Sequence, residues 1–235
     1  MPTIINGATG CNKFTTSSVS TGAIADDAVT AVKIAANAVT SSELAAASVG
    51  TLAIIDANVT TAKILDANVT PAKLSQPLTL TATQALTSGT YKDFLSIPSW
   101  VRRITVMFQG LSTNGTSYPI VQIGDSGGVE TSTYGGTTCS VVNAAATGAI
   151  NWSTGAQIIS AAATAYLHGC MVLTLTDPAT NLWVITVSAA NSASGIVFHG
   201  AGYKTLSATL NQVRLTTVNG TDAFDTGIVT ILYEG

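Results

Sequence analysis

The chain has 235 residues and a net charge of −3, and only 9% of its residues are charged although its mean hydropathy is +0.42. Ser, Thr, Asn and Gly must therefore form most of the polar surface, which favours a rigid extracellular or virion protein over a disordered one. The acidic balance argues against a nucleic-acid partner, because binding to phosphate backbones requires clustered Lys and Arg.

Two further features of the sequence restrict the cellular compartment that we expect for the protein. No apolar run reaches the ~18 to 20 residues of a membrane span, and the first residues lack the basic start and apolar segment of a signal peptide. The three cysteines, Cys11, Cys139 and Cys170, form no CxxC pair and leave at least one thiol unpaired. We therefore expect buried free thiols in a protein assembled in a reducing cytoplasm.

Residues 1–18 form a polar segment with too few apolar residues for a core of its own. One interpretation is a frayed terminus, which is how most termini behave. The other is an arm that becomes ordered when it docks to a larger particle, with Ile4, Ile5 and Phe14 as anchors. A protein mounted on a particle needs such an anchor, so we expect the second.

Residues 19–76 repeat one pattern of ten residues six times. A valine opens each copy, and a second aliphatic residue follows five positions later. The aliphatic residues are Val19, Ile24, Val29, Ile34, Val39, Leu44, Val49, Ile54, Val59, Ile64, Val69 and Leu74. Repetition of this kind indicates small units that meet only their neighbours and cannot bury an apolar side alone.

The period of ten excludes a continuous helix, which would turn successive valines by roughly 80°, and a continuous strand, which would alternate their faces. In the last copy, Thr70 before Pro71 suits an N-cap followed by the first residue of a helix. Asp66 suits the cap of a second short turn. We predict short helix-turn-helix decads, and because such helices are far too short to be stable alone, an obligate homo-oligomer.

Copies such as Asp-Ala-Asn-Val-Thr-Thr-Ala-Lys-Ile, from Asp56 to Ile64, resemble the short repeats of tailed-bacteriophage fibre proteins. These include head fibres whose shaft is a supercoiled triple bundle. The resemblance implies a homotrimer whose shaft core is formed by eight of the repeat residues. They are Val29, Ile34, Val39, Leu44, Val59, Ile64, Val69 and Leu74.

Residues 77–235 have the alternating pattern of β-strands, rich in β-branched residues. The clearest segments are 78–83, 103–108, 171–176, 182–187, 212–217 and 228–233. Turn sequences such as Asn219-Gly220 separate them. We predict eight to ten strands, no helix, and one antiparallel, jelly-roll-like β-sandwich.

Four segments of this head, residues 101–108, 121–128, 204–210 and 218–227, are similar to the C-terminal domain of phage and prophage tail-fibre proteins. The resemblance implies a distal domain that faces a receptor or a glycan. The exposed aromatics Tyr118, Tyr134 and Trp152, with Asn151, are the candidate binding residues, because flat amphipathic rings can stack on sugars. Their alternative is burial between sheets or chains.

Nothing in the head indicates catalysis. Its carboxylates lie in turns or at the terminus, so the pair required for glycoside hydrolysis is not evident. Gly124-Asp-Ser-Gly-Gly128 echoes the surroundings of serine-protease nucleophiles but lacks the accompanying pattern. His168 and Cys170 lie two residues apart, on one face of a predicted strand. We expect a hydrogen-bonded strand histidine there rather than a metal ligand, although a trimer axis could bring three histidines together.

The sequence therefore predicts a homotrimeric virion fibre, made in the host cytoplasm and exposed on the particle surface. Residues 1–18 would bind a capsid, collar or tail protein, residues 19–76 would form the shaft, and residues 77–235 would attach to a host-surface glycan or protein without turnover. We expect no cofactor, no metal and no membrane insertion. The alternatives are a head fibre or capsid-decoration protein without receptor binding and, more remotely, a polysaccharide-degrading spike.

Overall fold

The computed structural model describes residues 24–40, 44, 64, 69, 73–74, 76–142, 145–160 and 162–235. The chain divides into two compact units, Met1–Asn68 and Val69–Gly235. The boundary that we expected between shaft and head, at residues 76 and 77, lies further along the chain. The predicted anchor residues Ile4, Ile5 and Phe14 and the predicted shaft-core residue Val59 lie outside the described residues.

Two copies of the decad, within residues 24–40, share one local structure. Each contains a reverse turn, across residues 25–28 or 35–38, closed by a backbone hydrogen bond of 3.0 Å. The third residue of the turn, Asp27 or Asn37, has a positive φ of 59° or 65°. Asp and Asn adopt this left-handed conformation more readily than other residues with a side chain, because their short polar groups bond locally.

Between the two turns lies η2, a 3-10 turn at Ala31–Lys33. Thr30 precedes it in extended conformation, but its side chain makes no capping hydrogen bond. The copy at residues 29–38 thus contains one 3-10 turn and one reverse turn in place of the two helical turns that we expected. The left-handed residue explains the difference, because it cannot continue a right-handed helix. The predicted cap, Thr70, lies outside the described residues.

The described aliphatic side chains at the two repeating positions face solvent. Each described member of the predicted shaft core is between 42 and 56% exposed: Val29, Ile34, Val39, Leu44, Ile64, Val69 and Leu74. A single copy of the chain therefore provides no core for the described part of the repeat.

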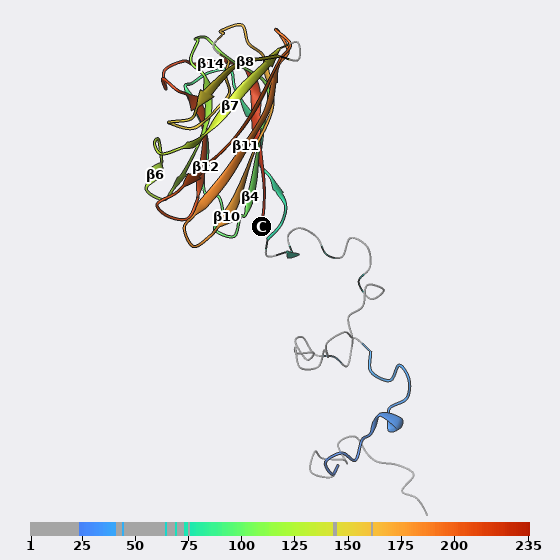
Figure 1. Cartoon of the computed structure of the whole chain (residues 1–235). Coiled ribbons are helices and arrows are strands. Elements are labelled where there is room, and N and C mark those ends of the chain that lie inside the picture. Colours follow the sequence, from blue (N-terminus) through green and yellow to red (C-terminus); the bar gives the residue numbers. More distant parts are fainter. Residues whose placement is uncertain are drawn as a thin grey trace, which may run out of the picture. The chain divides into compact units, whose positions relative to one another are not determined.

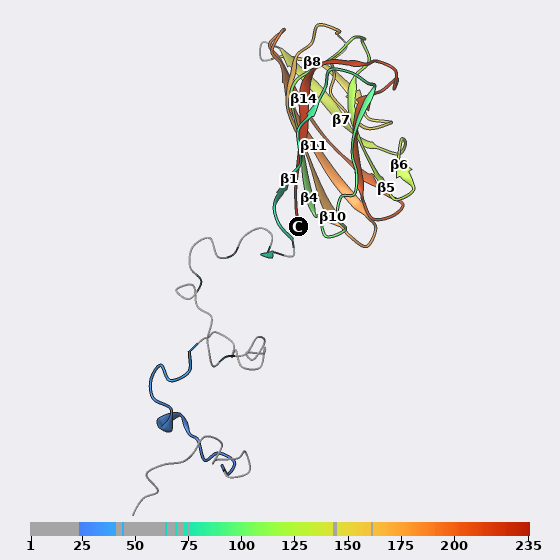
Figure 2. The same cartoon turned by 180° about the vertical axis from the view of Figure 1, so that it is seen from behind.

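The second unit contains two antiparallel sheets that enclose one hydrophobic core (Figures 1 and 2). The strands of the larger sheet are β1 (Thr79–Leu80), β2 (Gln84–Ala85), β4 (Arg103–Thr113), β7 (Gly135–Val142), β8 (Ala145–Asn151), β10 (Leu167–Asp177), β11 (Leu182–Asn191), β12 (Ile196–Thr205) and β14 (Phe224–Glu234). The strands of the smaller sheet are β3 (Tyr91–Phe94), β5 (Pro119–Asp125), β6 (Gly128–Val129), β9 (Ala156–Gln157) and β13 (Gln212–Thr217).

The strand order nests the beginning of the domain against its end. The larger sheet runs β1-β14-β4-β10-β11-β12-β7-β8, with β2 also on β14, and the smaller runs β3-β13-β5-β6, with β9 on β5. The mainly β, antiparallel fold is confirmed, and the two sheets are consistent with the predicted β-sandwich. The described residues form fourteen strands rather than eight to ten, because four strands have only two residues each.

Alternation of side chains places the core between the sheets. Along β4, Ile104, Val106 and Phe108 are buried while their neighbours are not. Along β11, Trp183 and Ile185 are likewise buried, and the residue between them is exposed. Burial of such side chains stabilises a domain by roughly 1.5 to 3 kcal/mol each, so this unit has a core of its own. No helix among the described residues is long and apolar enough to cross a membrane.

The chain enters and leaves the sandwich at one end. Thr79 and Leu80 of β1 pair with Tyr233 and Leu232 of β14. Strand β14 begins at Phe224, about 27 Å from Leu232 at the usual rise per residue. The turn at residues 218–223 therefore lies at the end of the sandwich opposite to Leu80.

Candidate ligand-binding groove

The four predicted binding residues do not form one site. Trp152 and Tyr134 are buried, with exposed fractions of 5 and 4%, so the expectation that they are exposed is wrong. Asn151 is exposed at the end of β8, where its side chain accepts a hydrogen bond of 2.9 Å from Thr137. Tyr118 is partly exposed in the segment before β5. None of the four lines the groove described below.

Trp152 is buried because glycines on two strands make room for its ring. A Cβ atom added at Gly136 of β7 or at Gly202 of β12 would collide with the ring. The indole Nε1 donates a hydrogen bond of 2.8 Å to Thr138 Oγ1. Gly136 and Gly202 are the sequence signal that could have indicated this burial, because only a residue without a side chain leaves room for the ring there.

Tyr134 holds the segment after β6 against β5. Its hydroxyl accepts a hydrogen bond of 2.7 Å from the Ile123 amide and donates one of 3.1 Å to the Glu130 carbonyl oxygen. Burial raises the pKa of this phenol above its ordinary value, despite the amide bond. A ring fixed in this way supports the fold and cannot stack on a ligand.

The residues that resembled a protease motif form the hairpin between β5 and β6. Asp125 accepts a hydrogen bond of 2.7 Å from the Gly127 amide, the usual role of Asp in a turn. Its other oxygen accepts one of 2.6 Å from the Ser207 hydroxyl. This bond to Ser207, helped by the Gly127 amide, holds the pKa of Asp125 below its ordinary value. The motif is structural.

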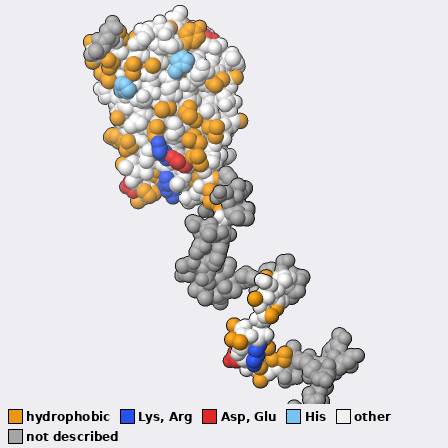
Figure 3. Space-filling model, turned by 90° about the vertical axis from the view of Figure 1, so that its right-hand side faces the viewer, with side chains coloured by type: hydrophobic (Ala, Val, Ile, Leu, Met, Phe, Trp, Pro, Cys, Tyr) orange, Lys and Arg blue, Asp and Glu red, His pale blue; other side chains and the backbone are white. Residues whose placement is uncertain are grey.

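His168 is a hydrogen-bonded strand histidine, as we expected. Its Nδ1 accepts from the Gly110 amide at 3.1 Å, and its Nε2 lies 3.0 Å from Ser192 Oγ. These bonds suit the neutral ring with the proton on Nε2. The outer face of the larger sheet, with its two histidines in pale blue, carries few charged side chains (Figure 3). The described residues contain no group of three or more His, Cys, Asp or Glu suited to a metal ion.

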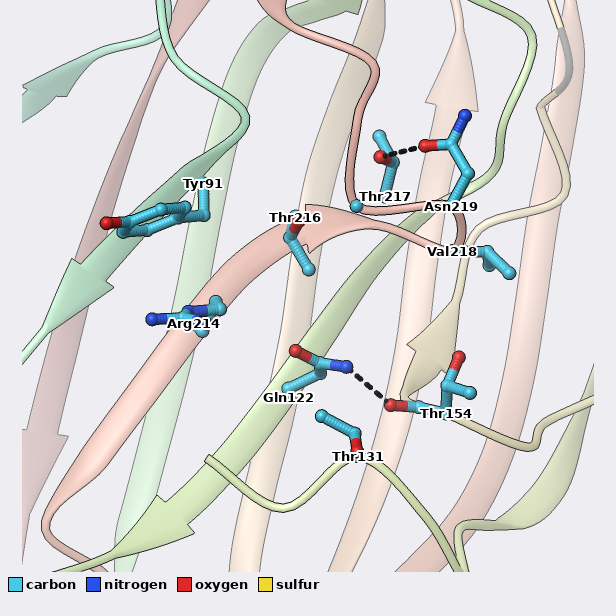
Figure 4. Close-up of a pocket in the computed structure, with 10 residues that line it drawn as sticks. Tyr91, Gln122, Thr131, Thr154, Arg214, Thr216, Thr217, Val218 and Asn219 are labelled. Atoms are coloured by element: carbon cyan, nitrogen blue, oxygen red, sulfur yellow. Dashed lines mark hydrogen bonds between the residues drawn. The ribbon is translucent and has the colours of Figure 1, made fainter. Parts of the chain in front are cut away.

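A groove of about 300 Å³ lies on the outer face of the smaller sheet (Figure 4). Strands β3, β5 and β13 form its floor, and the segments around Thr131, Thr154 and Val218 form its walls. Val213 and Leu215 of β13 point into the core, so Arg214 and Thr216 between them point outward. The residues that line it are Tyr91, Gln122, Thr131, Thr154, Arg214, Thr216, Thr217, Val218, Asn219 and Gly220.

A row of polar residues crosses the floor of the groove. Asp93, Arg214 and Gln122 are opposite one another on β3, β13 and β5. Arg214 donates two hydrogen bonds of 2.7 Å to the Asp93 carboxylate, which raise the pKa of the guanidinium. The carboxylate compensates the positive charge. The pair leaves Nη1 of Arg214 without a partner in the described part of the chain.

Tyr91 is the exposed aromatic ring of the groove. It lies opposite Thr216 in the next strand, and 52% of the residue is exposed. The Arg214 guanidinium lies 4.3 Å from the ring centroid, a cation–π distance that orients the ring. Figure 4 shows the ring at one side of the polar floor. Sequence reasoning missed Tyr91 because a four-residue strand with Lys and Asp has no clear alternation.

The opposite wall carries hydroxyl and amide groups. Gln122 donates a hydrogen bond of 2.8 Å to the Thr154 carbonyl oxygen, and Thr217 donates one of 2.8 Å to the Asn219 side chain. Gly155 lies so close to β5 that a Cβ there would be 2.9 Å from the Val121 oxygen. The Thr154 hydroxyl is buried and has no partner among the described residues. Buried polar atoms of this kind require an explanation.

The geometry therefore describes a polar groove with one exposed ring, at the end of the sandwich that is far from Leu80. Its groups can donate and accept hydrogen bonds and can stack on a flat ligand. Comparisons of the chain with family models, curated proteins and solved structures find no match. The resemblance to phage fibres thus rests on the residues quoted above.

Proposed function

We propose that the chain is a homotrimeric fibre protein of a tailed-phage virion, which displays its β-sandwich for attachment to the host surface. Residues 1–18 would dock to a capsid, collar or tail protein of the same particle. Residues 19–76 would wind with two further copies of the chain. Attachment is binding without turnover, and three linked sandwiches would raise weak contacts to a useful avidity.

One observation carries the proposal. The described aliphatic residues of the repeat are about half exposed in a single chain, whereas the sandwich has a buried hydrophobic core. Exposed aliphatic residues that recur at a fixed period of ten are the kind of apolar surface that marks an interaction site. An identical copy has the same period, so it matches this surface in every repeat. The number three comes from the resemblance to phage fibres.

Mass measurement of the full chain in solution tests the assembly. Native mass spectrometry should give three times the chain mass of 23.8 kDa. The mass should not change on dilution to low micromolar concentration, because an obligate oligomer has no stable monomer to release. A monomer of 23.8 kDa with a folded sandwich would contradict the proposal.

The particle itself tests the place and role of the protein. Electron microscopy of virions labelled with an antibody against the sandwich should locate it on the particle surface, and the same antibody should reduce adsorption to host cells. Label around the capsid with unchanged adsorption would instead assign a decoration protein. Release of oligosaccharides from the host surface by the purified protein would assign a degrading spike.

A further inference from the structure

The groove on the smaller sheet has the chemistry of a saccharide site. Proteins bind sugar rings by combining one aromatic side chain, for the apolar CH face, with hydroxyl, amide and guanidinium groups for the sugar hydroxyls. Tyr91 supplies a ring that is 52% exposed. Thr131, Thr154 and Gln122 lie across the groove from it (Figure 4). Several of the other lining residues also carry hydroxyl or amide groups.

The charges in the groove indicate whether its ligand is a neutral or an anionic saccharide. Arg214 is the charged residue of the lining, and its two hydrogen bonds of 2.7 Å to Asp93 compensate its charge. The described floor of the groove therefore offers no uncompensated positive charge to attract a carboxylate, sulfate or phosphate. A neutral hydroxyl can accept from Nη1 without disturbing that pair, because the guanidinium has five N–H donors. The floor therefore favours an uncharged ligand.

Two polar groups of the groove lining make no hydrogen bond to a described residue. Nη1 of Arg214 and the hydroxyl of Thr154 have no hydrogen-bond partner among the described residues. Nη1 can donate to a ligand or to water without breaking an existing bond, whereas the Thr154 hydroxyl is buried. The hydroxyl of Thr131, an exposed residue of the lining, is a second group that can bond a ligand. The volume of about 300 Å³ is at the lower limit of small-molecule sites.

We infer that this groove binds an uncharged saccharide, with Tyr91 stacked on the sugar ring and Arg214 and Thr131 bonded to its hydroxyls. The inference rests on the proposed role in host attachment and names the ligand class and the residues. The position fits that role, because the groove lies next to the 218–223 turn, at the end of the sandwich opposite to β1. The sites originally expected at Tyr134 and Trp152 are part of the core.

Saturation-transfer NMR on the full chain tests the inference. The probe is a panel of neutral oligosaccharides of glucose, galactose, N-acetylglucosamine and rhamnose, with glucuronate and sialic acid oligosaccharides as the charged set. We expect transfer to one or more neutral members. Tyr91→Ala should weaken that binding by about tenfold or more, the factor that corresponds to loss of one aromatic contact.

Tyr203→Ala is the matched control. Tyr203 is also 52% exposed, but it lies on the outer face of the larger sheet, on β12. The Tyr203→Ala variant should bind the same neutral oligosaccharides as strongly as the wild-type protein does. Thr131→Val is a second variant that keeps the size of an exposed side chain and removes one hydroxyl. It should weaken binding of the same oligosaccharide without changing the unfolding curve.

Three results would overturn the inference: no transfer to any neutral member, preference for the charged set, or equal loss in Tyr91→Ala and Tyr203→Ala. The mass of the full chain is measured separately. A trimer that binds none of the panel would reject the saccharide groove alone. A monomer that binds through Tyr91 would reject the fibre and leave the groove.

Discussion

The decads and the sandwich use the same aliphatic side chains in opposite ways. Ile34 of the second decad is about half exposed, whereas Ile231 of β14 is fully buried between two sheets. The difference comes from the sequence separation between the residues that contact one another. A decad contacts only what is near it in sequence, while β1 finds its partner in β14. One region therefore has a core of its own, whereas the described part of the other has none, and the proposed trimer would supply it.

The strongest test of this comparison replaces three repeat residues together. Val29→Asp, Ile34→Asp and Val39→Asp should convert the oligomer to a monomer, because a buried carboxylate without a partner is far too costly for a packed interface. Native mass spectrometry measures the change. The fluorescence of the protein should stay native, since all three tryptophans, at positions 100, 152 and 183, belong to the sandwich.

Val32→Asp is the control for that substitution. Val32 lies outside the repeating pair of positions and is 95% exposed. Its aspartate should leave the mass unchanged. If Val32→Asp dissociates the protein as completely as the triple variant, the surface between copies does not follow the period of ten.

The same chemical change in the two regions gives the next largest effect. Ile231→Ala should lower the free energy of unfolding of the sandwich by about 2 to 5 kcal/mol, the usual loss for a buried Ile or Leu. Ile34→Ala should change it by less than about 0.5 kcal/mol. Urea titration followed by tryptophan fluorescence measures both. Equal losses would mean that the sandwich depends on the repeat.

A buried ion pair should contribute next. Lys204 of β12 is buried and pairs with Glu130, and it also donates a hydrogen bond of 2.9 Å to Thr133. Glu130→Gln leaves this lysine without its counter-charge, at an expected loss of about 2 kcal/mol, below the usual value for fully buried pairs because Glu130 is partly exposed. Urea titration at neutral pH measures the loss.

The surface pair of Arg103 and Glu234, with a distance of 3.2 Å, is the natural control. Glu234→Gln should lower the free energy of unfolding by less than about 1 kcal/mol, because solvent screens the exposed charges. If the two glutamate variants are equally stable, burial does not distinguish the pairs, and Lys204 must have another source of stabilisation.

The smallest effect should depend on pH. Asp222 accepts hydrogen bonds from the Asn219 side chain at 2.6 Å and the Ser117 amide at 2.8 Å, and these bonds lower its pKa. A lowered folded-state pKa stabilises the fold fully above the unfolded pKa of about 3.9, and this contribution is lost as the pH falls through the folded value. Asp222→Asn should lower the free energy of unfolding by about 1 kcal/mol at neutral pH.

Urea titrations of Asp222→Asn and the wild type across the acidic range would show the dependence. The difference between them should shrink as the wild-type carboxylate becomes protonated. A difference that stays constant into strong acid would show that Asp222 acts through its shape and not its charge.

Strong alternation made part of the sandwich predictable. The predicted segment 212–217 coincides with β13, and 103–108 begins β4, because large apolar residues alternate there with polar ones. Strands β7 and β8 were not predicted, since their sequences are mostly small residues without large alternating side chains. Every residue of β5 is buried, so its pattern does not alternate at all.

The groove could not be predicted for a different reason. Tyr91 and Arg214 are far apart in sequence, and only the pairing of β3 with β13 brings them together. Trp152 was predicted to be exposed, but its ring fills the space above Gly136 and Gly202, and the sequence alone does not show that these three residues meet. The exposed aliphatics of the repeat could be predicted, because their period is visible in the sequence itself.

The pairing of β1 with β14 also determines where foreign sequence could be attached. A peptide fused after Gly235 would emerge beside Trp100 and Gln76, close to the point at which the repeats join the domain. A peptide inserted between Asn219 and Gly220 would instead emerge some 30 Å away, where Gly220 has a φ of 68° in an exposed turn. The tight turn, rather than the carboxyl terminus, is thus the position for an epitope or an affinity label that must lie far from the junction with the repeats.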